Sequence, residues 1–415
     1  MAWITLRGTL VDGSVWEERY NTKVKGIDLN GFWFKINDEN QQLASIDLTP
    51  LRECTNLQSL NLGFNQLMSI DLSPLSECKD LQHLILWANQ LTDVDLSPLS
   101  QCHNLQILEL GNNQLCEIDL SPLSQCIYLK HLNLGQDEYN GEGNQLTSVD
   151  LSPLSQCTDL ESLSLALNQL TYIDLSPLSA CINLQGIHLF NNQLIEVNLD
   201  PLNRCTRLKR LYLYNNDLTE IDLSGCTSLE ELHVGYNKLR RIDLSPLSQC
   251  TSLKFLDLHY NALETLDLSP LAACANLKEL GVGWNPLNYI DLSPLSQCTD
   301  LESLNLENSK LNEVDLSPLS SCLNLKNLQL SMNELITLDL SPLAACTKLE
   351  SLSLYNYQLR EVDLSPLAHC KKFSDLRIED SVTLLWVDDS LPRKFRLPRA
   401  LRKVYNRLTV RPPTG

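Results

Sequence analysis

Several features of membrane-spanning and exported proteins are missing from this sequence. No run of about 18 apolar residues occurs in its 415 residues, so no helix is expected to cross a membrane. Residues 1–8 lack the basic stretch followed by an apolar stretch that marks a signal peptide. We therefore expect a cytoplasmic protein.

The short motifs that mark many enzymes and zinc sites are also missing. There is no Gly-rich phosphate loop, no His-Glu-x-x-His sequence and no nucleophile elbow. No two cysteines are spaced as Cys-x-x-Cys, the arrangement typical of zinc sites. The sequence thus predicts a protein that is not an enzyme, has no small-molecule substrate and uses no metal or cofactor.

Positive charge is scarce. Lys and Arg number 32 against 51 Asp and Glu, which gives a formal net charge of −19. This acidity disfavours nucleic acid as a general partner. Apolar residues make up 43% of the chain, which is enough to build a hydrophobic core and argues against general disorder.

What the sequence does contain is a repeat, and the cysteines reveal it. Fourteen of the 15 cysteines follow one another at intervals of 24 residues, apart from one interval of 31 and one of 21, and only Cys116 lies outside the series. The series is Cys54, Cys78, Cys102, Cys126, Cys157, Cys181, Cys205, Cys226, Cys250, Cys274, Cys298, Cys322, Cys346 and Cys370. Self-similarity at such a period indicates a solenoid of stacked coils.

Each repeat has the same internal order. Three residues after the cysteine comes Leu-x-x-Leu-x-Leu, first at residues 57–62, and then a turn with an Asn, which Ser309 and Tyr357 replace in two repeats. Leu-x-Leu alternates apolar and polar residues, so it predicts a short strand with one face inward. The following Asp-Leu-Ser-Pro-Leu predicts a short helix or 3₁₀ turn that is capped by the Ser side chain.

This pattern resembles the leucine-rich repeat family over roughly residues 47–378, and its 24-residue repeats are similar to the cysteine-containing and bacterial types. The resemblance implies an α/β solenoid, a right-handed horseshoe with a concave parallel β-sheet and short helices or 3₁₀ turns on the convex side. We divide the chain into three parts. Residues 1–46 form an N-terminal cap with a hairpin and a degenerate first coil, 47–378 the repeats, and 379–415 a C-terminal cap with a basic tail.

Two columns of recurring residues have a structural interpretation. The cysteines are predicted to be buried free thiols that fill a crowded corner of each coil, with Cys116 exposed. An Asp precedes the Leu before this turn in 13 repeats, and we predict that it satisfies turn N–H groups instead of binding calcium. The acidic insertion at 135–144 is predicted to be a solvated loop at the rim.

The positions between and just after the strand leucines face solvent and are not needed for folding, so their identity indicates function. Repeats six to ten carry aromatic, His and Arg side chains there, and grouped aromatic and Arg side chains are typical of protein interfaces. We predict that a partner protein binds these residues on the concave face: His188, Phe190, Arg210, Tyr212, Tyr214, His233, Tyr236, Phe255, Asp257, His259, Tyr260 and Trp284. Glu231, Glu279 and Glu307 flank them, which favours a partner with some positive charge.

Two other interpretations of these residues remain open. An aromatic ladder across the strands would stiffen the sheet without binding anything. His233, Asp257 and His259 could also meet and hold a metal ion, which would make the protein a metal-dependent enzyme.

The C-terminal segment has the opposite charge from the rest of the chain. Residues 390–415 contain eight basic residues and no acidic one, whereas all 51 acidic residues precede them. Pro398 is predicted to start a helix that runs to Leu408. This helix would either cap the last coil or tether the protein to acidic lipid, nucleic acid or an acidic protein. The residues predicted to make such a contact are Arg396, Arg399, Arg402, Lys403 and Arg407.

Overall fold

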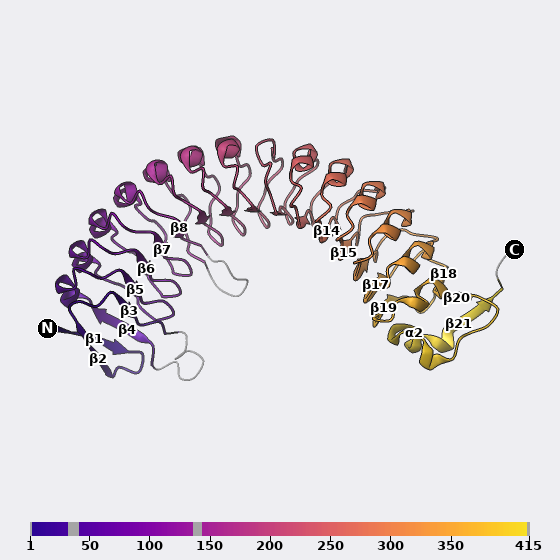
Figure 1. Cartoon of the computed structure of the whole chain (residues 1–415), viewed down its shortest axis with the longest axis horizontal. Helices are drawn as coiled ribbons and strands as arrows, with labels where there is room; N and C mark the ends of the chain where they lie inside the picture. The colour runs from indigo at the N-terminus through magenta and orange to yellow at the C-terminus, as the bar shows by residue number, and fades with distance from the viewer. Residues whose placement is uncertain (1, 32–40, 136–142, 413–415) are drawn as a thin grey trace. The chain divides into compact units, whose positions relative to one another are not determined.

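The computed structural model describes residues 2–31, 41–135 and 143–412 (Figure 1). Contacts divide the chain into two compact units, Met1–Asp217 and Leu218–Gly415. The three parts assigned from the sequence follow the repeat pattern and do not coincide with these two units. They remain a prediction. The acidic insertion lies mostly outside the described residues.

The chain begins with an antiparallel sheet in the order β2-β1-β4, formed by β1 (Trp3–Leu10), β2 (Val15–Asn21) and β4 (Leu43–Asp47). Strands β1 and β2 form the predicted hairpin. Gly13 provides the left-handed conformation of the turn, with φ +84°. Strand β3 (Gly26–Asp28) pairs in parallel with β5, so the predicted degenerate first coil is confirmed.

Each following repeat adds one short strand to a parallel sheet. In the first unit these strands are β5 (Ser59–Asn61), β6 (His83–Ile85), β7 (Ile107–Glu109), β8 (His131–Asn133), β9 (Ser162–Ser164), β10 (Gly186–His188) and β11 (Arg210–Tyr212). In the second they are β12 (Glu231–His233), β13 (Phe255–Asp257), β14 (Glu279–Gly281), β15 (Ser303–Asn305), β16 (Asn327–Gln329), β17 (Ser351–Leu354) and β19 (Asp375–Ile378). Equivalent leucines face each other across neighbouring strands, as Leu256 faces Leu280. The predicted parallel solenoid is therefore confirmed.

The Ser-Pro-Leu segments form 3₁₀ turns, and within each unit Figure 1 shows them in a row beside the row of strands. Their bounds are Thr49–Glu53, Ser73–Glu77, Ser97–Gln101, Ser121–Gln125, Ser152–Gln156, Ser176–Ala180, Asp200–Arg204, Ser245–Gln249, Ser269–Ala273, Ser293–Gln297, Ser317–Ser321, Ser341–Ala345 and Ser365–His369. We call this side of each unit the 3₁₀ face and the strand side the sheet face.

The prediction that Ser caps these turns is wrong. The residue before the turn is a Leu, and no side chain caps the turn, as at Leu72. Instead, the Asp just before this Leu stabilises the start of the turn. Its carboxylate accepts a hydrogen bond from the N–H of the first turn residue, a Ser or Thr, at 2.8–2.9 Å. All 13 aspartates of the column do so, which confirms the turn interpretation.

The cysteine column lies in the core, as predicted. All 14 members are buried free thiols, and Cys116 is exposed. The thiol of a repeat typically donates to the backbone carbonyl of the preceding cysteine, as Cys250 does to Cys226 at 3.1 Å. Burial raises the pKa of Cys78 and Cys181 to about 12, so these thiols stay protonated and unreactive.

The asparagine column joins successive coils. Asn89 donates to the carbonyls of Leu62 and Leu86 at 3.0 and 2.9 Å, and its own carbonyl accepts from the N–H of Leu67 at 3.1 Å. In the thirteenth repeat the register differs from the sequence alignment. Tyr357 is 87% exposed, whereas the preceding Asn356 is buried and accepts from the N–H of Asn333 at 2.7 Å.

The C-terminal segment packs as a cap. A parallel sheet joins β18 (Glu361–Asp363), β20 (Thr383–Val387) and β21 (Leu408–Arg411). The helix predicted from Pro398 to Leu408 is too long, because α2 spans only Arg399–Lys403 and a 3₁₀ turn, Tyr405–Arg407, precedes β21. A further 3₁₀ turn covers Lys394–Arg396.

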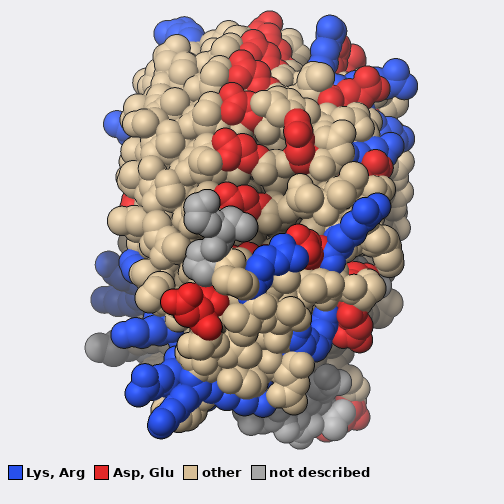
Figure 2. Space-filling model, turned by 90° about the vertical axis from the view of Figure 1, so that its right-hand side faces the viewer, with Lys and Arg blue, Asp and Glu red and all other residues tan. Residues whose placement is uncertain are grey.

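Cap contacts use both apolar and basic side chains. Leu397, Leu401 and Leu408 are buried. Arg407 pairs with Asp380 at 3.0 Å, and Arg411 makes two contacts with Glu361 at 3.0 and 3.1 Å. Figure 2 shows a group of Lys and Arg side chains at the lower edge of this view and others along its right side and top, while acidic side chains form a row that runs down from the top. No helix among the described residues is long and apolar enough to cross a membrane.

Candidate functional site

The sheet face carries a column of residues with left-handed backbone, one at the turn after each of the strands β5–β7 and β9–β16. In most repeats this is the residue just before the ladder Asn, and Asn191, Asn215 and Asn308 have φ of 53°, 54° and 50° there. Asn tolerates this conformation, whereas a bulky side chain makes it unfavourable. Larger side chains also occur there, singly as in Phe64, Leu167 and Met332. In three consecutive repeats of the second unit the position is aromatic: Tyr236, Tyr260 and Trp284 have φ of 54°, 51° and 60°.

These three aromatic rings stack on one another. The centroids of Tyr236 and Tyr260 are 4.3 Å apart with 14° between the ring planes, and those of Tyr260 and Trp284 are 4.6 Å apart with 10°. Tyr236 is 50% exposed, and Tyr260 and Trp284 are partly exposed. We call this row the aromatic stack; its three residues remain partly open to solvent.

The first unit has two smaller pairs among the predicted residues. His188 stacks on Tyr212 with centroids 4.8 Å apart, and Phe190 stacks on Tyr214 at 4.5 Å. Arg210 is exposed and lies opposite Gly186 in the strand register. The expectation that Phe190 faces solvent is wrong, because its side chain is buried beneath its neighbours.

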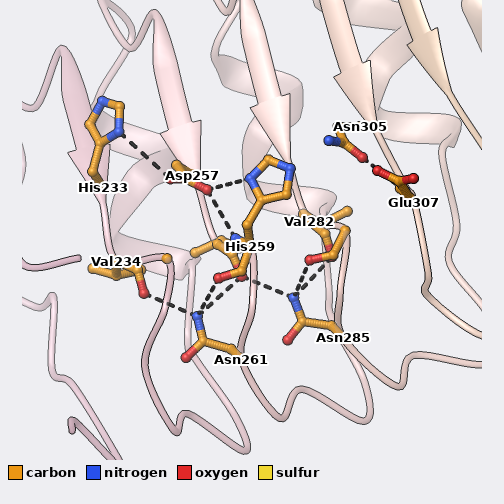
Figure 3. Close-up of polar contacts among 12 residues, drawn as sticks. His233, Val234, Asp257, His259, Asn261, Val282, Asn285, Asn305 and Glu307 are labelled. Atoms are coloured by element: carbon orange, nitrogen blue, oxygen red, sulfur yellow. Dashed lines mark hydrogen bonds and ion pairs between the residues drawn. The ribbon is translucent and has the colours of Figure 1, made fainter. Parts of the chain in front are cut away.

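Beside the aromatic stack lies a cluster of three ionisable side chains from β12, β13 and the turn after β13 (Figure 3). Nδ1 of His259 is 2.5 Å from Oδ1 of Asp257, and Nδ1 of His233 is 3.9 Å from Oδ2 of the same carboxylate. The N–H of His259 also donates to Asp257 at 2.9 Å. The sequence-based expectation that these three residues meet is thus confirmed.

The carboxylate is at the centre of this cluster, and its ionisation is strongly favoured. Burial alone would raise the pKa of Asp257, but hydrogen bonds from His233 and His259 and the charge of His259 outweigh burial and hold that pKa far below its usual range. Both imidazoles are turned toward the carboxylate. Among residues 2–31, 41–135 and 143–412, no group of three His, Cys, Asp or Glu side chains is placed to hold a metal.

Two glycines make room for the cluster and a third makes room for the neighbouring Asn305, and sequence reasoning missed all three. A Cβ on Gly281 would lie 2.0 Å from Cε1 of His259, and a Cβ on Gly235 would lie 2.9 Å from Oδ2 of Asp257. Gly283 similarly leaves space for Oδ1 of Asn305, at 2.8 Å from an added Cβ. The signal was present in the sequence as Gly-Val-Gly at 281–283, which replaces the usual polar residues around a strand leucine.

Phe255 and the acidic neighbours complete the surface. Phe255 is partly exposed and lies in register between Glu231 and Glu279 on the adjacent strands. Burial raises the pKa of Tyr260, and the neighbouring Tyr236 and the Glu307 carboxylate raise it further. The site therefore combines aromatic edges with negative charge, and nothing in it resembles an enclosed reaction centre.

Comparison with known proteins places this arrangement in a family. Family models for leucine-rich repeats match residues 79–125, 206–249 and 227–273 (two-copy type), residues 271–386 (BspA type, six copies) and residues 53–76. The crystal structure of an internalin, inlF of Listeria monocytogenes, is 30% identical with a TM-score of 0.64, and the match covers 80% of this chain and 88% of that one. The chain belongs to the leucine-rich repeat family.

Other leucine-rich repeat structures share the fold. The functional domain of InlJ from Listeria monocytogenes, which includes a cysteine ladder, is 25% identical with a TM-score of 0.65 over 90% of this chain and 76% of that one. The plant peptide hormone receptor RGFR1, solved in complex with RGF2, is 23% identical with a TM-score of 0.62 over 88% and 62% of the two chains, which shows the fold alone. None of the curated proteins compared matches this chain.

Proposed function

We propose that this leucine-rich repeat protein is a non-enzymatic scaffold that binds a partner protein through the sheet face of its repeats. The observation that carries the proposal is the row of three stacked, partly exposed rings of Tyr236, Tyr260 and Trp284, each on left-handed backbone. Bulky residues in this conformation are costly, and such strain is found mostly where function requires it. Asn tolerates this conformation and has the position in four other repeats, and the single large side chains Phe64, Leu167 and Met332 have it elsewhere, but only here do three aromatic residues in consecutive repeats share it.

The stiffening interpretation explains less of this arrangement. Rings can stack across strands from ordinary extended positions, as His188 and Tyr212 do. Such a ladder needs no left-handed residue and no exposed hydroxyl edge. Exposed Tyr and Trp side chains that are already held in place lose little entropy when a partner covers them, which makes them effective binding residues.

The family supports the same class of function. Leucine-rich repeat proteins are generally interaction scaffolds, because stacked repeats present an extended surface. One structural neighbour was solved with a peptide hormone bound, which is a property of that receptor. From this similarity we propose only that the partner of the present chain is also a protein or peptide.

Affinity capture from the cells of origin tests the proposal. The variant Tyr236→Ala with Tyr260→Ala should lose most of the captured partner while its thermal melting temperature stays close to that of the wild type. The matched control changes Tyr172→Ala and Tyr289→Ala, two tyrosines that are 59% and 62% exposed outside the stack. Equal capture by both variants would show that the aromatic stack is not the binding surface.

A second candidate is a tethering role for the C-terminal cap. Arg396, Arg399, Arg402 and Lys403 remain exposed although the cap is packed, and Phe395 beside them is 66% exposed. Deleting residues 390–415 would be a poor test, because Leu397, Leu401 and Leu408 are part of the core. Replacing the three arginines by Gln removes charge but keeps the cap, and loss of an acidic binding partner in this variant alone would support tethering.

We also propose that the protein works in a reducing compartment such as the cytoplasm. Fourteen buried free thiols are suited to conditions in which thiols stay reduced. Cell fractionation followed by thiol counting on the native protein would test this, and recovery of the protein with oxidised column cysteines would contradict it.

A further inference from the structure

The aromatic stack is open at its Trp284 end. The equivalent residue of the next repeat is Asn308, which shares the left-handed backbone but has no ring to continue the stack. The N–H of Trp284 donates to the carbonyl of Glu307 at 2.6 Å, so the backbones of residues 284 and 307 lie side by side. Trp284 is therefore the last ring of the stack, and its backbone lies next to that of an acidic residue.

Glu307 forms no ion pair with a described Lys, Arg or His, in contrast to Glu230 and Glu302 of the same unit. Glu230 pairs with Lys254 at 2.6 Å, and Glu302 pairs with Lys326 at 2.5 Å. Within the described residues, by contrast, no Lys, Arg or His forms an ion pair with Glu307 or with Glu279 on β14. The N–H of Glu307 donates to Oδ1 of Asn305 at 2.9 Å, which holds the backbone from which this side chain projects.

The Glu307 carboxylate also acts directly on the aromatic stack. Its charge is one of the causes that raise the pKa of Tyr260, the central ring, after burial and the neighbouring Tyr236. The negative charge is therefore close enough to the rings to act on a ligand that touches them. An aromatic face and an unpaired carboxylate together form a binding site for a planar cation.

Building on the proposed function, we infer that the Trp284 end of the stack receives an arginine side chain from a basic, extended segment of the partner protein. The guanidinium group stacks on an aromatic face and donates two parallel hydrogen bonds to a carboxylate, so it matches Trp284 and Glu307 together. Glu279 adds negative charge on the neighbouring strand. An acidic segment is disfavoured by these two carboxylates and by the net charge of −19.

The cluster of His233, Asp257 and His259 does not compete for this cation. Nδ1 of His259 lies 2.5 Å and Nδ1 of His233 lies 3.9 Å from the Asp257 carboxylate, so this carboxylate already has partners within the protein. The unpaired charge of the surface is thus concentrated at Glu279 and Glu307. This places the arginine at one end of the stack and leaves Tyr236, at the other end, to contact an apolar or polar part of the same segment.

Selection from a random peptide library displayed on phage tests the inference on the full-length chain. Wild-type protein is used for selection, and peptides retained by the Tyr236→Ala, Tyr260→Ala variant are discarded. We expect the remaining peptides to be enriched in Arg. If the remaining peptides need the aromatic stack for binding but are not enriched in Arg, the inference is overturned and the proposed function stands. Failure to obtain any stack-dependent peptide would count against both.

A selected Arg-containing peptide then allows a direct measurement. Isothermal titration calorimetry should show that Glu307→Gln weakens its binding about tenfold, because a charge-assisted contact is lost. The matched control Glu334→Gln changes an exposed glutamate outside the site and should leave the affinity within about twofold. Replacing the peptide Arg by Lys should also weaken binding, since Lys cannot stack and pair at once. Equal affinity for wild type and Glu307→Gln would overturn the assignment.

Discussion

The ring of Tyr260 lies on the ring of Trp284 with 4.6 Å between centroids, although both residues have left-handed backbone. The stacking and the backbone conformation have opposite effects on stability. A stacked pair contributes about 0.5–1.5 kcal/mol, and a bulky left-handed residue costs about 1–3 kcal/mol. The aromatic residues are therefore close to neutral for folding, which is why we assign them to binding.

The first prediction follows from this balance. Replacing Tyr260 by Asn removes two stacking contacts but introduces a residue that tolerates φ of 51°. The free energy of unfolding should change by less than about 1 kcal/mol, whereas Leu258→Ala on the same turn should lose about 2–5 kcal/mol. Urea denaturation measures both. A loss for Tyr260→Asn as large as that for Leu258→Ala would mean that the stack is a structural element.

The second prediction concerns the cradle beneath His259. An added methyl group at Gly281 would lie 2.0 Å from the imidazole, so Gly281→Ala should displace the ring and weaken its contact with Asp257. The pKa of Asp257 should then rise toward its usual range, which carboxyl NMR can follow. Gly26→Ala is the control, because its Cβ would meet only Ser59 at 3.9 Å. An unchanged Asp257 pKa in Gly281→Ala would refute the described geometry.

The third prediction concerns the thiols. Burial raises the pKa of Cys126 and Cys298 to about 12, and their column is buried throughout. In native protein at neutral pH, iodoacetamide should therefore modify Cys116 first, and the other 14 cysteines should react only after unfolding. Mass spectrometry of the labelled protein checks the order. The variant Cys116→Ser should resist labelling, and rapid labelling of a column cysteine would contradict the buried assignment.

The fourth prediction concerns acid stability. Hydrogen bonds from the backbone and side chain of Ser245 lower the pKa of Asp243, and Asp71, Asp119 and Asp315 are held low in the same way. A folded-state pKa below the unfolded value of about 3.9 stabilises the protein above that pH and ceases to do so as pH falls through the folded-state pKa. The melting temperature should therefore drop steeply below about pH 4.

Comparing the variants Asp243→Asn and Asp243→Ala separates the contribution of the turn hydrogen bond to stability from that of the charge. Asn can still accept the turn hydrogen bond, as Asn198 does from the N–H of Asp200 at 2.9 Å. At pH 7 the Asn variant should melt near the wild type and the Ala variant at a lower temperature. On acidification the Asn variant should lose less stability than the wild type, and an identical acid profile would exclude a contribution from this carboxylate.

The repeat pattern was sufficient to predict most of the fold. Each Leu, Cys and Asn recurs at a fixed place, so the strand, the buried columns and the turn are specified many times over. The errors arose where one residue departs from the column average. Tyr357 was aligned with the ladder position that Asn356 occupies, and the Asp rather than the Ser closes the turn.

The candidate site was harder to predict, because it depends on side chains meeting across repeats. Spacing was enough to expect His233, Asp257 and His259 near one another. It gave no reason to expect that Phe190 is buried or that Gly281 cradles an imidazole. The left-handed backbone of Trp284 could not be predicted either, because nothing in the sequence distinguishes that position from an ordinary turn residue.

Hydroxyl-radical footprinting of the chain with and without its captured partner tests the central claim most directly, because it reads the exposure of single aromatic side chains. The account predicts that Tyr236, Tyr260 and Trp284 become protected, while Tyr172, Tyr289 and Tyr357, which are 59%, 62% and 87% exposed, keep their reactivity. Protection confined to the latter three tyrosines, with the aromatic stack as reactive as before, would contradict it.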